Sequence, residues 1–159
     1  HLPYGMQLGS GTYDVNLGIT YTTFLNNYSY GGQINALVRL GRNTFDYSLG
    51  NQYKINTWAQ KIWTKEISTS IKGSALFISD INGSDSSVSA MVAGMNPLYT
   101  IEQGSIRADI GIGINYFPKT NMLTGNRLAV EFNVPVFRYT NSINVVADSL
   151  LTFGIQRIL

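Results

Sequence analysis

The stretch Ile106-Arg-Ala-Asp-Ile-Gly-Ile-Gly-Ile-Asn-Tyr116 alternates strictly between apolar and polar residues. Ile, Ala or Tyr occupies every even-numbered position, and Arg, Asp, Gly or Asn occupies every odd-numbered one. This two-residue period is typical of a β-strand with one apolar and one polar face, and a 3.6-residue helical period does not fit it. The stretch therefore predicts a strand.

Six further stretches repeat this alternation along the chain. They cover residues 13–22, 33–40, 47–59, 67–77, 127–136 and 148–156. Seven such strands joined by turns indicate an all-β, antiparallel protein. A length of 159 residues is the size of one domain, so we assign residues 1–159 to a single domain.

The composition excludes several classes of function. Charged residues make up only 13% of the chain, about half the ~25% of ordinary soluble domains, although the hydrophobic content is 44%. Because Cys is absent, a disulfide scaffold, a Cys-ligated metal site and thiol catalysis are excluded. A net charge of +2 does not indicate a nucleic-acid partner. We predict neither a metal nor a cofactor.

Two architectures share the alternating pattern. A soluble sandwich or lipocalin-like protein points its apolar face inward, whereas a transmembrane barrel points it into lipid and its polar face into the lumen. The polar faces here consist mainly of Gly, Ser, Thr, Asn and Gln. No charge falls in the apolar phase within a predicted strand; Arg157 comes closest, near a strand end from which it could snorkel to an interface. Both features favour the membrane barrel.

Aromatic residues add a third feature, because they gather near the predicted strand ends as in the two girdles of a membrane barrel. One rim would carry Tyr13, Tyr47, Phe137 and Tyr139, and the other Tyr21, Trp63, Tyr116 and Phe117. We therefore predict an antiparallel transmembrane β-barrel in the bacterial outer membrane, in contact with outer-membrane lipid.

The connections predict the orientation and raise a question of strand number. Barrels of this kind have long extracellular loops, which places the long segment 79–104 outside. Seven strands leave the two termini on opposite sides, whereas bacterial barrels usually have an even number. One alternative is that residues 2–8, in which apolar residues also alternate, form a short eighth strand. The other is that further strands of the barrel come from elsewhere. The periodicity leaves both alternatives open.

Nine charged residues fall in the inward phase of the predicted barrel and are candidates for lining a pore. They are Asp14, Arg39, Lys54, Lys72, Arg107, Asp109, Arg127, Glu131 and Asp148. In an open lumen these charges would set ion selectivity. In a packed interior they would pair with one another and fill space. The apolar patch 90–95 in the long loop would either fold inward as a plug or contact a partner.

Enzymatic chemistry has little support in the sequence. His1 is the single histidine, which argues against a Ser-His-Asp triad and a His-rich metal site. Asp109 and Glu131 lie on neighbouring strands as a candidate acid/base pair, but Arg107 and Arg127 favour ordinary salt bridges there. We predict that the protein is not an enzyme.

Several segments, in order along the chain, resemble a bacterial outer-membrane barrel family described as transporter-like or as meta-pathway phenol-degradation proteins. They are residues 1–14 (HLPYGMQLGSGTYD), 58–63 (WAQKIW), 68–70 (STS), 107–115 (RADIGIGIN), 125–131 (GNRLAVE) with Pro135, and 151–157. The resemblance implies the C-terminal half of a larger barrel with about twelve strands. Leu159 departs from the family, whose barrels usually end in Phe.

We therefore expect a channel for passive passage of small solutes, with aromatic or otherwise apolar ones as candidates. The first alternative is a structural or partner-binding barrel with a closed lumen. The second is a lipid-modifying barrel enzyme. The sequence identifies no substrate, gating mechanism or oligomeric state.

Overall fold

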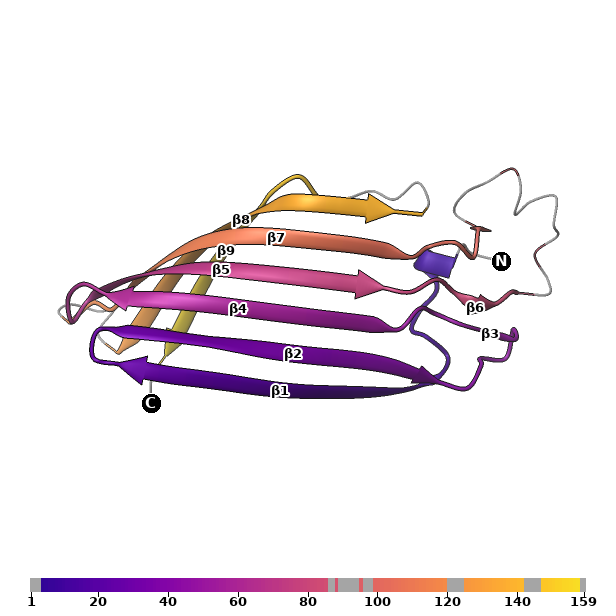
Figure 1. The fold of residues 1–159 in the computed structure, drawn as a ribbon, viewed down its shortest axis with the longest axis horizontal. Helices are drawn as coiled ribbons and strands as arrows, with labels where there is room; N and C mark the ends of the chain where they lie inside the picture. The colour runs from indigo at the N-terminus through magenta and orange to yellow at the C-terminus, as the bar shows by residue number, and fades with distance from the viewer. Residues whose placement is uncertain are drawn as a thin grey trace.

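Seven strands form one antiparallel sheet in which each strand pairs with its neighbours along the chain (Figure 1). The computed structural model describes residues 4–85, 88, 95, 99–119, 125–141 and 147–157. The strands, in sheet order, are β1 (Tyr13–Leu25), β2 (Tyr28–Leu40), β4 (Gln52–Ile62), β5 (Ile67–Ile78), β7 (Ser105–Tyr116), β8 (Asn126–Thr140) and β9 (Leu150–Arg157). The prediction of an all-β, antiparallel protein is confirmed.

The sheet curls into a half-barrel, with β1 and β9 at its two edges. The connections alternate between its ends, which we call the hairpin end and the loop end (Figure 1). The hairpin end carries the two-residue turn between β1 and β2, where Asn26 has a φ of 47°, and the short β4–β5 turn. At the loop end, the described residues 79–85 follow β5 and the described residues 99–104 precede β7. No helix in the described part of the chain is long and apolar enough to cross a membrane.

A small cluster at the loop end has no counterpart in the sequence prediction. It contains a 3-10 helix, η1 (Tyr4–Met6), and a separate two-stranded sheet of β3 (Tyr47–Ser48) and β6 (Asn82–Gly83). The prediction of an eighth strand over residues 2–8 is therefore wrong for the described residues 4–8. Tyr4, Tyr47 and Ile81 form the buried hydrophobic cluster of the described residues.

The predicted strand 47–59 is divided in two. Asn51 breaks it, because its side-chain oxygen accepts a hydrogen bond from the Arg39 backbone N–H at 2.9 Å. Its own N–H donates to the Ser79 hydroxyl at 2.9 Å. These side-chain bonds replace the regular ladder at this point. Tyr47–Ser48 consequently belongs to the small sheet, and β4 begins at Gln52.

A β-bulge near the loop end of β8 changes which face its side chains occupy. Asp109 pairs with Pro135 and Ala108 pairs with Phe137, so Val136 is the extra residue. A proline lacks the N–H that a ladder requires and is commonly accommodated at a bulge. Beyond the bulge, Phe137 and Tyr139 share the face of the apolar residues, and Arg138 turns to the polar face.

Candidate functional site

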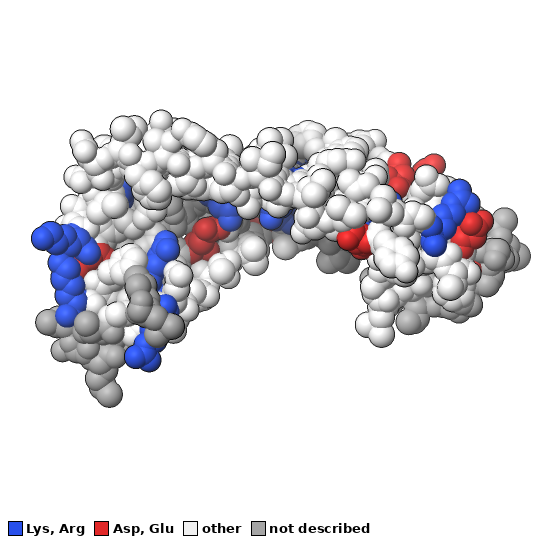
Figure 2. Space-filling view, turned by 90° about the horizontal axis from the view of Figure 1, so that it is seen from below, with Lys and Arg blue, Asp and Glu red and all other residues white. Residues whose placement is uncertain are grey.

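The two faces of the curved sheet differ in chemistry. Figure 2 shows an arch whose outer side is almost free of charged atoms, while Lys, Arg, Asp and Glu gather in the hollow beneath it and at its two ends. We call these sides the convex face and the concave face. Because successive residues of a strand point to opposite faces, each strand contributes to both.

The convex face is apolar and lies open to the surroundings. Its central residues are half to two-thirds exposed, among them Ile71 (55%) and Ile112 (62%). The accessible surface of the chain is 10938 Å², whereas a compact monomer of this mass exposes roughly 7,900 Å². The face also contains a groove of about 550 Å³ lined by Ile71, Ile112, Ile114, Val130 and Phe132. An apolar surface of this extent is typical of contact with a membrane or a partner.

Six of the eight predicted girdle residues are exposed near the strand ends. Tyr13, Phe137 and Tyr139 lie toward the loop end, and Tyr21, Trp63 and Tyr116 toward the hairpin end. The prediction missed four further exposed aromatics of the convex phase that lie near strand ends, Tyr28, Tyr30, Tyr53 and Phe77. Their alternation phase and their closeness to strand ends would have identified them.

The girdle prediction is wrong for Tyr47 and Phe117. Tyr47 is only 2% exposed and packs edge-to-face on Tyr4, with 4.7 Å between ring centroids. Its hydroxyl donates to the Gln7 side-chain oxygen at 2.6 Å, and burial raises the pKa of this phenol. Phe117 is half-buried, and the Arg127 guanidinium lies 5.7 Å from its ring centroid. Neither ring belongs to the convex face, because the loop cluster holds Tyr47 and a concave-face arginine covers Phe117.

Lys61 is an exception to the apolar convex face. Together with Arg157, it is one of two charged residues of the convex phase in the described strands. Its ammonium lies 3.9 Å from the centroid of the Trp63 ring and 5.4 Å from that of Tyr28. Lys61 stands one residue before the end of β4, at the hairpin end. The charge is therefore placed at the rim and covered by aromatic rings.

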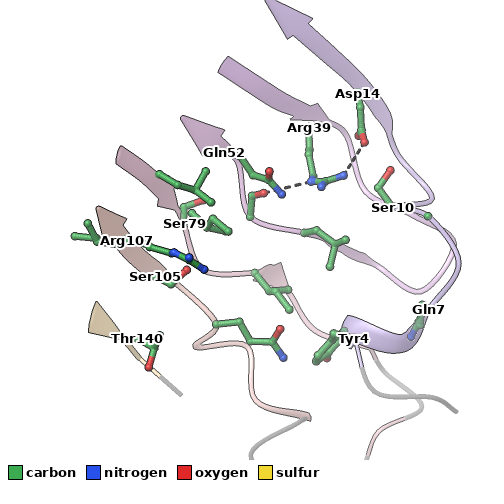
Figure 3. A pocket seen from close by; sticks show the side chains of 18 of the residues that line it. Tyr4, Gln7, Ser10, Asp14, Arg39, Gln52, Ser79, Ser105, Arg107 and Thr140 are labelled. Atoms are coloured by element: carbon green, nitrogen blue, oxygen red, sulfur yellow. Dashed lines mark hydrogen bonds and ion pairs between the residues drawn. The ribbon is translucent and has the colours of Figure 1, made fainter. Parts of the chain in front are cut away.

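A cavity of about 710 Å³ opens on the concave face at the loop end (Figure 3). Its lining includes Asp14 and Arg39, which form an ion pair at 2.6 Å between Arg39 Nη1 and Asp14 Oδ2. Arg39 Nε also donates to the Gly50 carbonyl at 3.2 Å. The pairing of β1 with β2 brings these two charges together, since Asp14 faces Arg39 in the register.

Two more arginines line the same cavity. Arg107 Nε binds Asp109 Oδ1 at 2.7 Å, and Arg138 Nη2 binds Asp148 Oδ1 at 2.8 Å. Arg138 was not predicted as a lining residue, because strict alternation through β8 ignores the bulge at Val136. The adjacent Pro135 is the signal that could have located it. Asp148 was predicted on a strand but precedes β9, and its side chain is 91% exposed.

A second cavity of about 510 Å³ lies on the concave face nearer the hairpin end. Lys72 Nζ binds Glu131 Oε1 at 2.9 Å, and the Asn133 amide donates to the same oxygen at 2.9 Å. Arg127 donates twice to Asn115 Oδ1, at 3.0 Å through Nε and 2.6 Å through Nη2. The polar groups of this cavity thus satisfy one another.

Trp58 lines the second cavity and was not predicted as a site residue. Its ring lies against Gly31 of the neighbouring strand, where a Cβ atom would collide with the ring. The pairing of Gly31 with Trp58 in the register explains the contact. Trp58 shares its even-numbered phase with the polar residues of β4, and this phase could have identified it as a residue of the concave face.

Lys54 differs from the other predicted lining charges. It lines a smaller cavity of about 250 Å³ with Asn16, Asn35, Gln52 and Leu76. The side chain is exposed and forms no ion pair with any described residue. Among the predicted lining charges, Lys54 is therefore the one whose side chain has no ion pair or hydrogen bond with another described residue.

The structure does not bring Asp109 and Glu131 together. Each carboxylate binds its own cation, Arg107 and Lys72 respectively. In the register, Glu131 faces Gly113 of β7, which lies four residues from Asp109 on the same strand. At 3.3 Å per residue, the two carboxylates are therefore displaced along the strands by roughly 13 Å. The apolar patch predicted at 90–95 lies outside the described residues, apart from Met95.

Comparison of the chain with protein-family models, with curated proteins and with solved structures finds no match.

Proposed function

We propose that the chain is part of a transmembrane β-barrel of the bacterial outer membrane that passes small solutes. The observation that carries the proposal is the division of one sheet into an exposed apolar convex face and a polar, charged concave face. In a membrane barrel the first faces lipid and the second lines the lumen. A soluble protein would instead bury its apolar face, which here remains open.

The direction of the edge strands supports a larger barrel. The seven strands alternate in direction, so β1 and β9 both run from the loop end to the hairpin end. An all-antiparallel closure then needs an odd number of additional strands, of which the outermost two run the opposite way. Five such strands would give the twelve expected from the family resemblance. A second copy of this chain, inserted in the same orientation, would place its β1 beside β9 and its β9 beside β1. These pairs would be parallel, so a second copy does not complete an all-antiparallel barrel.

The concave face supports passage of a solute but also supports the closed-lumen alternative. Its two main cavities, of about 710 and 510 Å³, lie toward opposite ends of the same surface. The ion pairs around them favour a filled interior, in which charges bind one another rather than solutes. The exposed Lys54, which forms no ion pair with any described residue, favours an open lumen. A channel is the proposal, and a closed structural barrel is the second candidate.

Ion selectivity in planar bilayers tests the proposal. The variant Lys54→Glu replaces a lumen cation with an anion, so the reversal potential in a KCl gradient should move toward cation selectivity. Lys65→Glu makes the same charge change in the β4–β5 turn and should leave the reversal potential near that of the parent protein.

The recordings separate the candidates. Conductance that shifts only with Lys54→Glu supports the channel. Insertion without conductance would contradict the channel and favour the closed barrel. Failure of the barrel, closed by its additional strands, to enter bilayers would contradict the membrane assignment itself.

A further inference from the structure

Arg107 and Arg138 face each other directly across β7 and β8 at the loop end. Both line the cavity of about 710 Å³. Side chains in such positions have Cβ atoms roughly 4.5–5.5 Å apart, and like charges placed there repel each other. Asp109 and Asp148 each bind one of these arginines, and an anion placed between the two guanidinium groups would relieve the repulsion that remains.

The carboxylates that bind these arginines leave part of each guanidinium free. Arg107 uses Nε on Asp109, and Arg138 uses Nη2 on Asp148. A guanidinium carries five N–H donors, and among the described residues neither arginine makes another hydrogen bond. Neither Asp109 nor Asp148 lines the cavity. Donors that remain on both arginines are therefore available to a ligand.

The charge of the lining favours an anion. The described residues that line the cavity include three arginines, Arg39, Arg107 and Arg138, and one carboxylate, Asp14. Asp14 binds Arg39, which leaves the Arg107–Arg138 side of the cavity without a carboxylate on its wall. Asp109 and Asp148 bind Arg107 and Arg138 from outside the lining, so the two guanidinium groups are the charged groups that this side presents to the cavity.

The remaining lining supplies both apolar and hydroxyl groups. Leu76, Ile78 and Ile81 provide apolar wall, and Ser79, Ser105 and Thr140 provide hydroxyls (Figure 3). The volume of about 710 Å³ lies within the roughly 300–1,000 Å³ of small-molecule sites. A ligand that matches this lining has an anionic head and a compact apolar body.

We propose that this cavity binds small organic carboxylates, with the carboxylate held by Arg107 and Arg138 and the apolar body against Leu76 and Ile78. The inference rests on the proposed channel and names its substrate class. A carboxylate accepts hydrogen bonds from both guanidinium groups and neutralises their repulsion. The cavity lies at the loop end, which the proposed orientation places outside, so it would be the first site that an entering solute meets.

Calorimetric titration of the full chain, folded in detergent, tests the proposal with benzoate as the probe. Benzoate should bind, and its uncharged analogue benzyl alcohol should bind far more weakly. Acetate should also bind more weakly, because it lacks the apolar body. Arg138→Gln removes charge-assisted hydrogen bonds and should weaken benzoate binding about tenfold to a hundredfold. Arg42→Gln is the matched control, since Arg42 lies at the same end and pairs with Asp46 outside the cavity.

Thermal unfolding separates a lost site from a lost fold. Without ligand, Arg138→Gln should unfold at a temperature close to that of the parent chain, because relief of the repulsion with Arg107 offsets the loss of the ion pair with the exposed Asp148. Benzoate should raise the unfolding temperature of the parent and of Arg42→Gln but not that of Arg138→Gln.

Equal binding of benzoate and benzyl alcohol, or undiminished binding by a folded Arg138→Gln variant, would overturn the site. Failure of the site and failure of the channel are distinguishable. Conductance without benzoate binding overturns only the carboxylate site, and benzoate binding without conductance overturns only the channel.

Discussion

The convex and concave faces are built from alternate residues of the same strands, yet they are stabilised differently. On the convex face, side chains such as Ile112 are exposed and have no polar partners. On the concave face, charges such as Lys72 and Glu131 form ion pairs across strands. The sheet therefore encloses no apolar core of its own, and its apolar face must be covered from outside.

Two places depart from this division, and both lie near the ends of strands. At the Val136 bulge, neighbouring residues of β8 exchange faces, which places Arg138 in the concave cavity. At the hairpin end, Lys61 brings a charge to the convex face under aromatic rings. Substitutions at the centre and at these two places test how strict the division is.

The largest effect is expected from a charge at the centre of the convex face. Ile112→Arg should lower the free energy of unfolding in lipid vesicles by about 2–4 kcal/mol, because an arginine near the bilayer midplane is poorly solvated. Urea titration followed by tryptophan fluorescence measures this loss.

The matched concave substitution is Ser74→Arg. Ser74 faces Asp109 in the register, so a new arginine there has a carboxylate beside it and should cost much less. Equal losses for the two variants would show that the faces do not differ in environment. A greater loss for Ser74→Arg would reverse the assignment of lipid and lumen.

Deletion of Val136 together with Phe137 should have the next largest effect. Arg138 would then follow Pro135 directly and face Ala108, so Arg138 would enter the convex face and Tyr139 would leave it. Loss of two aromatic side chains from an apolar environment should cost at least about 2 kcal/mol of unfolding free energy in vesicles.

Deletion of Val136 alone is the control, because it removes only the extra residue. Pro135 would still face Asp109 and Phe137 would still face Ala108, so the side chains beyond the bulge should keep their faces and much less stability should be lost. Benzoate binding gives a second readout, since the double deletion takes Arg138 out of the cavity and the single deletion does not. Equal stability of the two variants would contradict the assignment of faces beyond the bulge.

The smallest effect is expected at Lys61. Lys61→Gln removes the cation from the Trp63 and Tyr28 rings and should lower the unfolding free energy by about 0.5–1 kcal/mol, the value of an exposed cation–π contact. Lys65→Gln in the adjacent turn is the control, and chemical unfolding in vesicles compares the two. A gain in stability for Lys61→Gln would mean that the convex face excludes charge even at its rim.

Much of the fold was predictable because it depends on local periodicity. The alternation from Ile106 to Tyr116 coincides with all but the first residue of β7, and the phases of β1 and β2 were also read correctly. The Asp14–Arg39 pair could not be derived from either strand alone, because it depends on the register between them. Tyr47 was misassigned because its local pattern continues that of β4, whereas Asn51 breaks the strand through contacts with distant residues.

The sequence by itself determined the strands, their antiparallel order and the residues of each face, because side chains in a strand alternate with a period of two residues. Only the tertiary structure decided the curvature, the change of face at Val136 and the meeting of Arg107 with Arg138. These features depend on pairing between segments far apart in the chain, and a single-residue change of register exchanges the faces. The candidate carboxylate site belongs to this second class.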